Sequence, residues 1–198
     1  ARREHHEARD RLRVRHGRGE DSQAVPEREA FEDPHRGHGI DVPVPGDLTR
    51  TAIAAQPEWL AQVPTDRRLP SGRVVAVGCG TSFHAAQTTG AGVDALEFLL
   101  APPEADLLVL VSHEGTTPLT IEAAQAFAGP KWLVTGKPGS DLAALCDVIV
   151  YATPDVEQSY CHTVSYTCAV AALAALRGED VSWLPDAVAE VLAGERLP

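Results

Sequence analysis

Five short apolar runs alternate with helix-like segments between residues 73 and 176, and this alternation limits the folds open to the chain. Strands that are buried on both faces and separated by helices form parallel sheets with right-handed crossovers. We therefore predict a doubly wound α/β domain. Its parallel sheet should have five strands in the flavodoxin-like order 2-1-3-4-5, with helices on both faces.

The domain is expected to follow a polar arm. Residues 1–46 are mixed in charge, rich in histidine and almost free of large apolar side chains, which predicts a solvated arm. Residues 47–198 are expected to form a single domain that opens with a helix over 47–64, broken near Pro57. Strands are predicted at 73–78, 93–97, 107–111, 131–135 and 147–151, and further helices at 82–90, 117–128, 140–145, 157–176 and 184–193.

Charge and composition disfavour several classes of protein. The net charge is −11, and residues 47–198 hold 8 of the 17 basic and 18 of the 28 acidic residues, which disfavours a nucleic-acid partner. No apolar run approaches the roughly 18–20 residues of a membrane helix, and no secretory signal is evident. The four cysteines form no CxxC pair and fit a reducing compartment. We expect a cytoplasmic protein without a metal ion or other cofactor.

The sequence Gly-Cys-Gly-Thr-Ser at residues 78–82 joins the first predicted strand to a helix, as phosphate-binding turns do. A dinucleotide site needs a third glycine where Phe83 stands, and a nucleoside triphosphate site needs a lysine that this turn lacks. Thr81 and Ser82 remain, at a helix N-terminus where hydroxyls, free N–H groups and the helix dipole favour an anion. Taken alone, the turn is better explained by an ordinary capping pair.

A second polar turn follows the third predicted strand. Residues 112–117 read Ser-His-Glu-Gly-Thr-Thr, and an amphipathic helix begins near Pro118. The first and third strands are neighbours in the predicted order, and open α/β sheets bind ligands in the crevice at the carboxyl ends of such strands. Two helix N-termini rich in hydroxyl groups are therefore expected to converge on one anion.

Three motifs in this order resemble the SIS (sugar isomerase) domain family over roughly residues 50–176. They are the turn at 78–82, the turn at 112–117 in place of Ser-x-Ser-Gly-x-Thr, and residues 154–170, which are similar to a Glu-x-x-x-Ala-Ser-Thr-Lys helix start. Residues 52–60 also resemble the segment before the isomerase half of glucosamine-6-phosphate synthase.

This resemblance implies a phosphosugar ligand and names the residues that would bind it. Glu157 stands where related isomerases often place a carboxylate base, which moves a proton between C1 and C2 of an open-chain sugar through an enediol. His113 and His162 are candidates for assisting that proton transfer. The expected function is aldose–ketose isomerisation of a sugar or amino-sugar phosphate, or a related deglycating or deaminating reaction. The expected phosphosugar-binding residues are Gly80, Thr81, Ser82, Ser112, Glu114, Gly115, Thr116 and Thr117.

Two departures from the family pattern keep a second function open. Glu114 replaces the second serine of the family motif, and its carboxylate would repel a phosphate that it faced. Val164 replaces the family lysine, which removes an ammonium group. Both changes favour the alternative of a non-catalytic sugar-phosphate sensor. Glu157 also has a structural alternative, as a first-turn carboxylate that interacts favourably with the helix dipole.

A homodimer that completes the site is the expected assembly. The segment 164–176 is apolar around most of its circumference, so a helix there needs cover on several sides. The resemblance implies the same arrangement, because single domains of this family commonly complete their site across a dimer.

Overall fold

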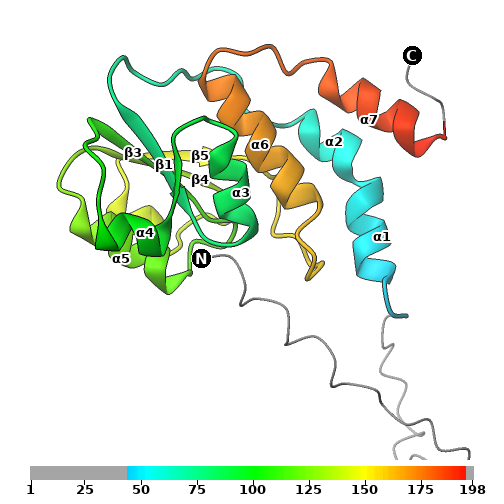
Figure 1. Cartoon of the computed structure of the whole chain (residues 1–198). Coiled ribbons are helices and arrows are strands. Elements are labelled where there is room, and N and C mark those ends of the chain that lie inside the picture. Colours follow the sequence, from blue (N-terminus) through cyan, green and yellow to red (C-terminus); the bar gives the residue numbers. More distant parts are fainter. Residues whose placement is uncertain (1–43, 195–198) are drawn as a thin grey trace, which may run out of the picture. The chain divides into compact units, whose positions relative to one another are not determined.

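The computed structural model of the chain describes residues 44–194, so nearly all of the predicted arm lies outside the described residues. A parallel sheet of five strands lies at the centre, in the order β2-β1-β3-β4-β5 (Figure 1). The predicted fold class and strand order are thereby confirmed. The strands are β1 (Val74–Gly78), β2 (Gly92–Asp94), β3 (Leu107–Val111), β4 (Lys131–Thr135) and β5 (Val148–Tyr151).

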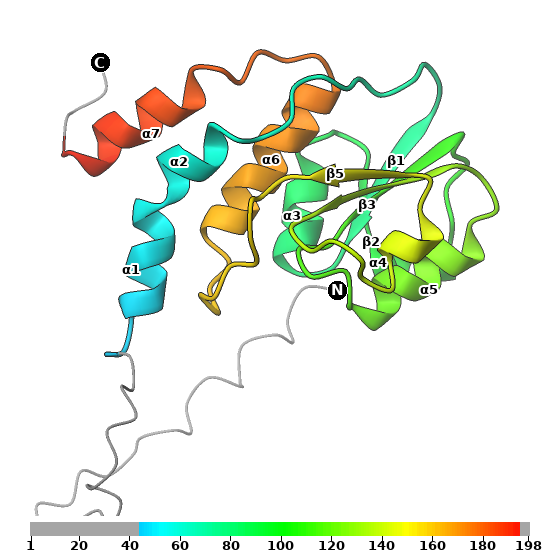
Figure 2. The same ribbon diagram turned by 180° about the vertical axis from the view of Figure 1, so that it is seen from behind.

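Helices cover both faces of this sheet, as the views from opposite sides in Figures 1 and 2 show. One face carries α3 and α6, and the other carries α4 and α5. No helix of the described residues is both long enough and apolar enough to cross a membrane. The helices are α1 (Asp47–Ala54), α2 (Gln56–Leu60), α3 (Thr81–Gln87), α4 (Ala95–Leu100), α5 (Pro118–Ala126), the 3-10 helix η1 (Ala143–Leu145), α6 (Val164–Leu176) and α7 (Leu184–Leu192).

The central strand β3 separates two hydrophobic cores, because its side chains alternate between the faces of the sheet. Val109 and Val111 belong to the core beneath α3 and α6, whereas Leu108 and Leu110 belong to the core beneath α4 and α5. All of its residues are buried. This pattern of burial on both faces explains why the strand reads as a continuous apolar run.

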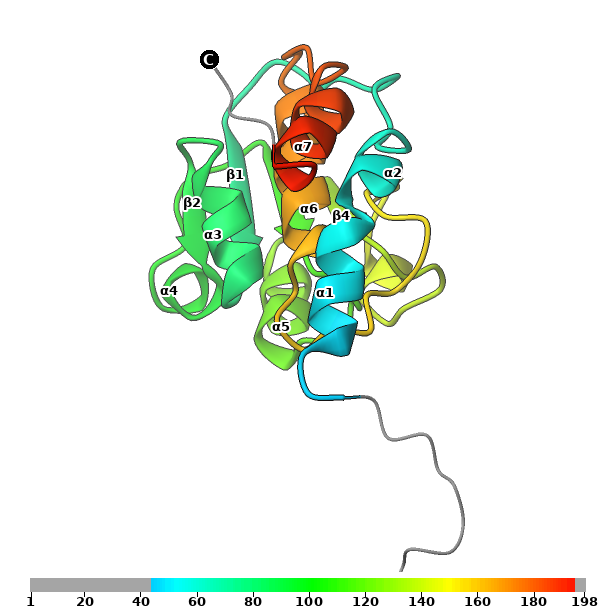
Figure 3. The same ribbon diagram turned by 90° about the vertical axis from the view of Figure 1, so that its right-hand side faces the viewer.

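Three helices form a further layer outside α6. Figure 3 shows α1, α2 and α7 on the outer side of α6. Leu60 of α2 is buried in the same core as α6, and α2 also packs against α7. The predicted break near Pro57 is confirmed, because α1 ends at Ala54 and α2 begins at Gln56.

Three predicted elements differ clearly from the observed ones, and in each a side-chain hydrogen bond lies at the start of the observed helix. The strand predicted over 93–97 ends at Asp94, whose Oδ1 accepts a hydrogen bond from the Leu96 amide at 2.9 Å and begins α4. The helix predicted over 157–176 begins only at Val164. The helix predicted over 140–145 is the short η1, preceded by Ser140, whose Oγ accepts from the Ala143 amide at 3.3 Å.

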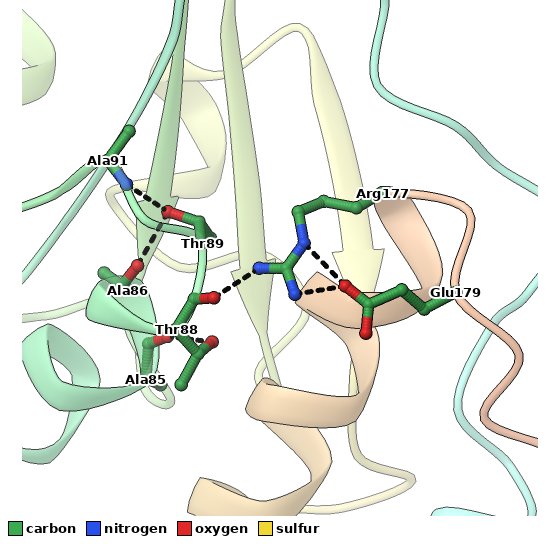
Figure 4. A network of polar contacts seen from close by, with 7 residues as sticks. All are labelled: Ala85, Ala86, Thr88, Thr89, Ala91, Arg177 and Glu179. Atoms are coloured by element: carbon green, nitrogen blue, oxygen red, sulfur yellow. Dashed lines mark hydrogen bonds and ion pairs between the residues drawn. The ribbon is translucent and has the colours of Figure 1, made fainter.

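Arg177 joins the carboxyl ends of α3 and α6 (Figure 4). Its Nη1 donates to the carbonyl oxygen of Thr88 at 2.6 Å, and its guanidinium also pairs with Glu179. Carbonyl groups at the end of a helix lack partners within the helix, and a cation there is favourable. Arg177 thus holds α3 against α6, and the opposite ends of both helices border the candidate site.

Candidate phosphosugar-binding site

A cavity of about 170 Å³ lies at the carboxyl ends of the strands. Both predicted turns line it, together with the ends of β4 and β5 and one side of α6. Gly80, Gly115 and Glu157 do not line it, although they adjoin residues that do. The predicted site residues that line it are Thr81, Ser82, Ser112, His113, Glu114, Thr116, Thr117 and His162.

The first turn places the start of α3 directly over the end of β1. Gly80 adopts a positive φ of 56°, and no side chain of the described residues caps the helix that follows. A Cβ atom on Gly78 would lie 2.6 Å from the backbone carbonyl carbon of Ser82, so only glycine permits this close approach of helix and strand. Thr81 and Ser82 consequently lie at the carboxyl ends of the strands, where they line the cavity.

The second turn is held in shape by Ser112 and Gly115. Ser112 is only 2% exposed, and its Oγ accepts from the Gly115 amide at 3.2 Å and lies 3.4 Å from the Thr117 Oγ1. Gly115 has a φ of 66°, and a Cβ there would lie 2.1 Å from the Oγ of Ser140. Thr117 precedes α5, which likewise has no side-chain cap among the described residues. Two helix starts without a side-chain cap among the described residues therefore border one cavity.

The two histidines lie side by side in the cavity wall. Their ring centroids lie 5.9 Å apart with an interplanar angle of 73°. The Nε2 of His113 accepts a hydrogen bond from the Glu157 amide at 2.8 Å. Burial lowers the pKa of His113 below its ordinary value, and the nearby His162 acts in the same direction, against Glu157, Glu114 and Asp155.

His162 has an unusual backbone. Its φ of 48° makes it the one non-glycine residue with a positive φ between residues 44 and 194. Non-glycine residues in this region cost conformational energy, and they are concentrated at functional sites. The strained residue here lines the cavity, which makes it a candidate functional residue.

Glu157 is 6% exposed, and its carboxylate is fully engaged. Oε1 accepts from the backbone amide and hydroxyl of Thr163 at 2.8 and 3.1 Å, and Oε2 from those of Ser165 at 2.8 and 2.6 Å. Burial alone would raise the pKa of Glu157, but these hydrogen bonds outweigh it and lower the pKa. The carboxylate caps the amino end of α6, which explains why the helix begins at Val164.

These contacts do not test the predicted role of Glu157 as a base. They define which hydrogen bonds would have to break before its carboxylate could accept a proton. A carboxylate offers about four lone-pair sites, and here four donors occupy them. To take a proton from a ligand, the side chain must first release Thr163 or Ser165.

Several cavity residues were not predicted from the sequence. Thr135 is the last residue of β4, Thr153 lies two residues after the end of β5, and Tyr166 lies in the first turn of α6. The rule that ligands bind at the carboxyl ends of strands applies to β4 and β5 as well, and it would have identified both threonines. Tyr166 carries no comparable signal, because an aromatic residue in an apolar helix is usually a core residue.

Neutral donors dominate the cavity wall. No lysine or arginine of the described residues lines it. Within residues 44–194 there is also no group of three or more His, Cys, Asp or Glu residues that could hold a metal ion. The arrangement can bind an anion through hydroxyls and backbone N–H groups.

Comparison with known proteins supports the fold. No protein-family model and no curated protein matches the chain. The C-terminal domain of glucosamine-fructose-6-phosphate aminotransferase from Francisella tularensis is similar in structure, with a TM-score of 0.56 and 17% identity over 74% of this chain and 54% of that chain. Glucosamine-6-phosphate deaminase from Thermotoga maritima is similar with a TM-score of 0.52 and 19% identity, over 72% of this chain and 53% of that chain.

These similarities confirm the predicted resemblance at the level of the fold. The chain shares its α/β fold with both of these solved structures. It spans about half the length of each of the two proteins.

Proposed function

We propose that the cavity binds the phosphate group of a phosphorylated sugar. The observation that carries the proposal is the convergence of two turns, each rich in hydroxyl groups and each opening an uncapped helix, on one cavity. Uncapped helix starts offer N–H groups and a favourable dipole to an anion. The two structural neighbours support the proposal, because both are named for phosphorylated sugars.

The sugar itself would extend from the phosphate toward Glu114 and the histidines. Glu114 is exposed and lies at the cavity wall, where its carboxylate can accept hydrogen bonds from sugar hydroxyls or from an ammonium group. The cavity volume of about 170 Å³ is below the roughly 300–1,000 Å³ of common ligand pockets. We propose that a second copy of the chain covers the remainder of the ligand, so that the functional unit is a homodimer.

Aldose–ketose isomerisation is the second candidate function. The imidazole of His162 at the cavity wall favours it, because His162 can assist the transfer of a proton between C1 and C2 of an open-chain sugar through an enediol. Glu157 remains the base implied by the sequence resemblance, under the requirement that it releases one of its hydrogen-bond donors.

A non-catalytic sensor is the competing alternative within this proposal. Val164 takes the place of the family lysine and is fully buried, so no ammonium group enters the cavity from that position. The capping bonds of Glu157 also suit a protein that binds a sugar phosphate without converting it.

A thermal-shift titration tests the binding proposal. The panel comprises fructose 6-phosphate, glucosamine 6-phosphate, N-acetylglucosamine 6-phosphate and ribulose 5-phosphate, each beside its unphosphorylated sugar. A ligand at about 100 times its dissociation constant stabilises the fold by about 2.7 kcal/mol, which gives a clear shift. We expect one phosphosugar to stabilise the wild type and the control Ser182→Ala, and Ser112→Ala to bind it less tightly.

Stabilisation by unphosphorylated sugars alone, or by none of the panel, would contradict the phosphate assignment. Incubation of the bound phosphosugar in deuterium oxide then separates the enzyme from the sensor. An enediol route exchanges the transferred proton with solvent, so NMR should show deuterium at C2 of the aldose. A sensor leaves the sugar unlabelled in the wild type and in every variant.

A further inference from the structure

We propose that His113 is a positioning residue, whose neutral imidazole holds the segment 157–163 against the end of the sheet and so presents His162 to the cavity. The segment lies between β5 and α6, and it contains the strained His162. Hydrogen bonds attach it to the rest of the domain.

The attachments of the segment fall into three kinds. The Glu157 carboxylate bonds Thr163 and Ser165, which ties the segment back to the start of α6. The Thr49 hydroxyl of α1 lies 3.1 Å from the Oγ of Ser159. The link to the sheet is the hydrogen bond from the Glu157 amide to the Nε2 of His113, which follows β3.

This link fixes the protonation state of His113. Because Nε2 accepts a hydrogen bond, the ring must be neutral, with its proton on Nδ1. The other edge of the ring packs on Gly136, where a Cβ would lie 2.5 Å from Cε1 and 2.7 Å from Nδ1. The ring is therefore held on both edges, and Gly136 leaves the room that it needs.

The two histidines consequently have different roles. Both nitrogen-bearing edges of His113 face protein, whereas the ring of His162 has no hydrogen-bond partner within residues 44–194. His162 is the imidazole that remains available to a ligand, and His113 acts through it by holding its segment in place.

Protonation of His113 should break the link. A hydrogen on Nε2 would face the Glu157 N–H, and two donors cannot share a hydrogen bond. Burial of the ring, which lowers its pKa, keeps it neutral near neutral pH. The ionisable groups around His113 are His162, Glu114, Asp155 and Glu157, with Lys137 next to Gly136, and Cys79 and Tyr166 along the cavity wall.

Hydrogen exchange of the Glu157 amide tests the link directly, with two substitutions at position 113. His113→Gln can place an amide oxygen near the position of Nε2 and cannot be protonated, whereas His113→Leu offers no acceptor. We expect the Glu157 amide to exchange about tenfold faster in His113→Leu than in the wild type, and the glutamine variant to restore most of the protection. The Ser112 amide, bonded to the Val134 carbonyl at 3.1 Å, serves as the internal reference.

The pH dependence distinguishes positioning by a neutral imidazole from packing alone. In the wild type, protection of the Glu157 amide should decrease as His113 becomes protonated, at a pH below the ordinary histidine pKa of 6.5, after correction for the intrinsic exchange rate. His113→Gln should show no such fall. Equal protection in the leucine variant and the wild type, or the same pH profile in the glutamine variant and the wild type, would overturn the proposal.

A second readout does not depend on the leucine variant being folded. The imidazole nitrogen spectrum of the wild type should show His113 with its proton on Nδ1, and a proton on Nε2 would contradict the link. The claim that the segment serves the ligand rests on the proposed function. If no phosphosugar binds the wild type, that function fails, whereas the exchange and nitrogen data still decide the role of His113.

Discussion

The two ends of the sheet are built from different polar chemistry. At the amino ends of the strands, Arg73 pairs with Asp106 and Glu104, and the Lys131 amide donates to the Asp147 Oδ2 at 2.7 Å. At the carboxyl ends, hydroxyls and helix N–H groups border a cavity that no lysine or arginine of the described residues lines.

This difference indicates which end of the sheet has hydrogen-bond donors available to a ligand. The charged groups at the amino ends already have partners, and the hydrogen bonds from Arg73 lower the pKa of Asp106. The hydroxyl and helix N–H groups at the carboxyl ends border a cavity, where an incoming anion can reach them. A ligand is therefore expected at the carboxyl ends of the strands only.

Glu157→Ala should be the most destabilising substitution at the carboxyl end. It leaves the amides of Thr163 and Ser165 without their acceptor at a buried helix start, and we expect a loss of about 3 kcal/mol in unfolding free energy. Urea unfolding measures the loss, with the exposed Glu190→Ala as the control.

The stabilising effect of Glu157 should also depend on pH. Its folded pKa is lowered from 4.5, so the contribution is present above that value and disappears as the pH falls through the folded pKa. An alanine variant as stable as the wild type at neutral pH would show that the cap is unimportant.

Gly115→Ala should cause the next largest loss of stability, because it combines backbone strain with a steric clash against Ser140. Gly115 and Gly139 share a φ of 66°, but a Cβ at Gly115 would meet the Ser140 Oγ, whereas at Gly139 it would meet nothing within 4 Å. We expect about 1 kcal/mol for Gly139→Ala and about 2–3 kcal/mol for Gly115→Ala. Calorimetric melting compares the two, and similar losses would mean that the turn tolerates the added methyl group.

Ser112→Ala should weaken ligand binding more than it weakens the fold. The substitution removes the acceptor of the Gly115 amide and a hydroxyl of the cavity, at a cost to stability of about 1 kcal/mol. Affinity for the stabilising phosphosugar should fall about tenfold in isothermal titration. Unchanged affinity would move the phosphate away from this turn.

A smaller effect is expected from His113 as the pH falls. Its pKa is lower in the folded state than the ordinary value of 6.5, so the unfolded chain takes up the proton first and stability declines as the pH drops through that value. His113→Gln should remove this part of the decline in melting temperature. Identical slopes in both proteins would mean that His113 titrates alike in the folded and unfolded states.

Arg73→Ala should have the smallest effect on the stability of the fold, and no effect on the affinity for the ligand. Its ion pairs are exposed at the amino ends of the strands, far along β1 from the cavity. The phosphosugar affinity should equal that of the wild type in the same titration. A lowered affinity would break the distinction between the two ends of the sheet.

Much of the fold could be predicted from the sequence, because strands buried on both faces of a sheet appear there as continuous apolar runs. β3 and β4 are apolar runs, and they lie where predicted. The errors at β2 and α6 have a common cause, since Asp94 and Glu157 fix the helix starts through side-chain hydrogen bonds that hydrophobic patterns do not encode.

Less of the candidate site than of the fold could be predicted from the sequence. The turns at 78–82 and 112–117 could be placed together, because strand order brings the ends of β1 and β3 side by side. The difference between the histidines could not be predicted. It depends on the left-handed backbone of His162 and on the Glu157 amide meeting the Nε2 of His113, and both arise from the folded course of one loop.

The most direct test of the central claim is a backbone-amide NMR titration of the wild type with the stabilising phosphosugar. We predict that the shifted amides cluster in residues 80–83 and 112–119, whereas those of Arg73, Asp106 and Lys131 stay in place. Shifts centred on the amino ends of the strands, or no shifts at either turn, would contradict the assignment of the cavity as the phosphate site.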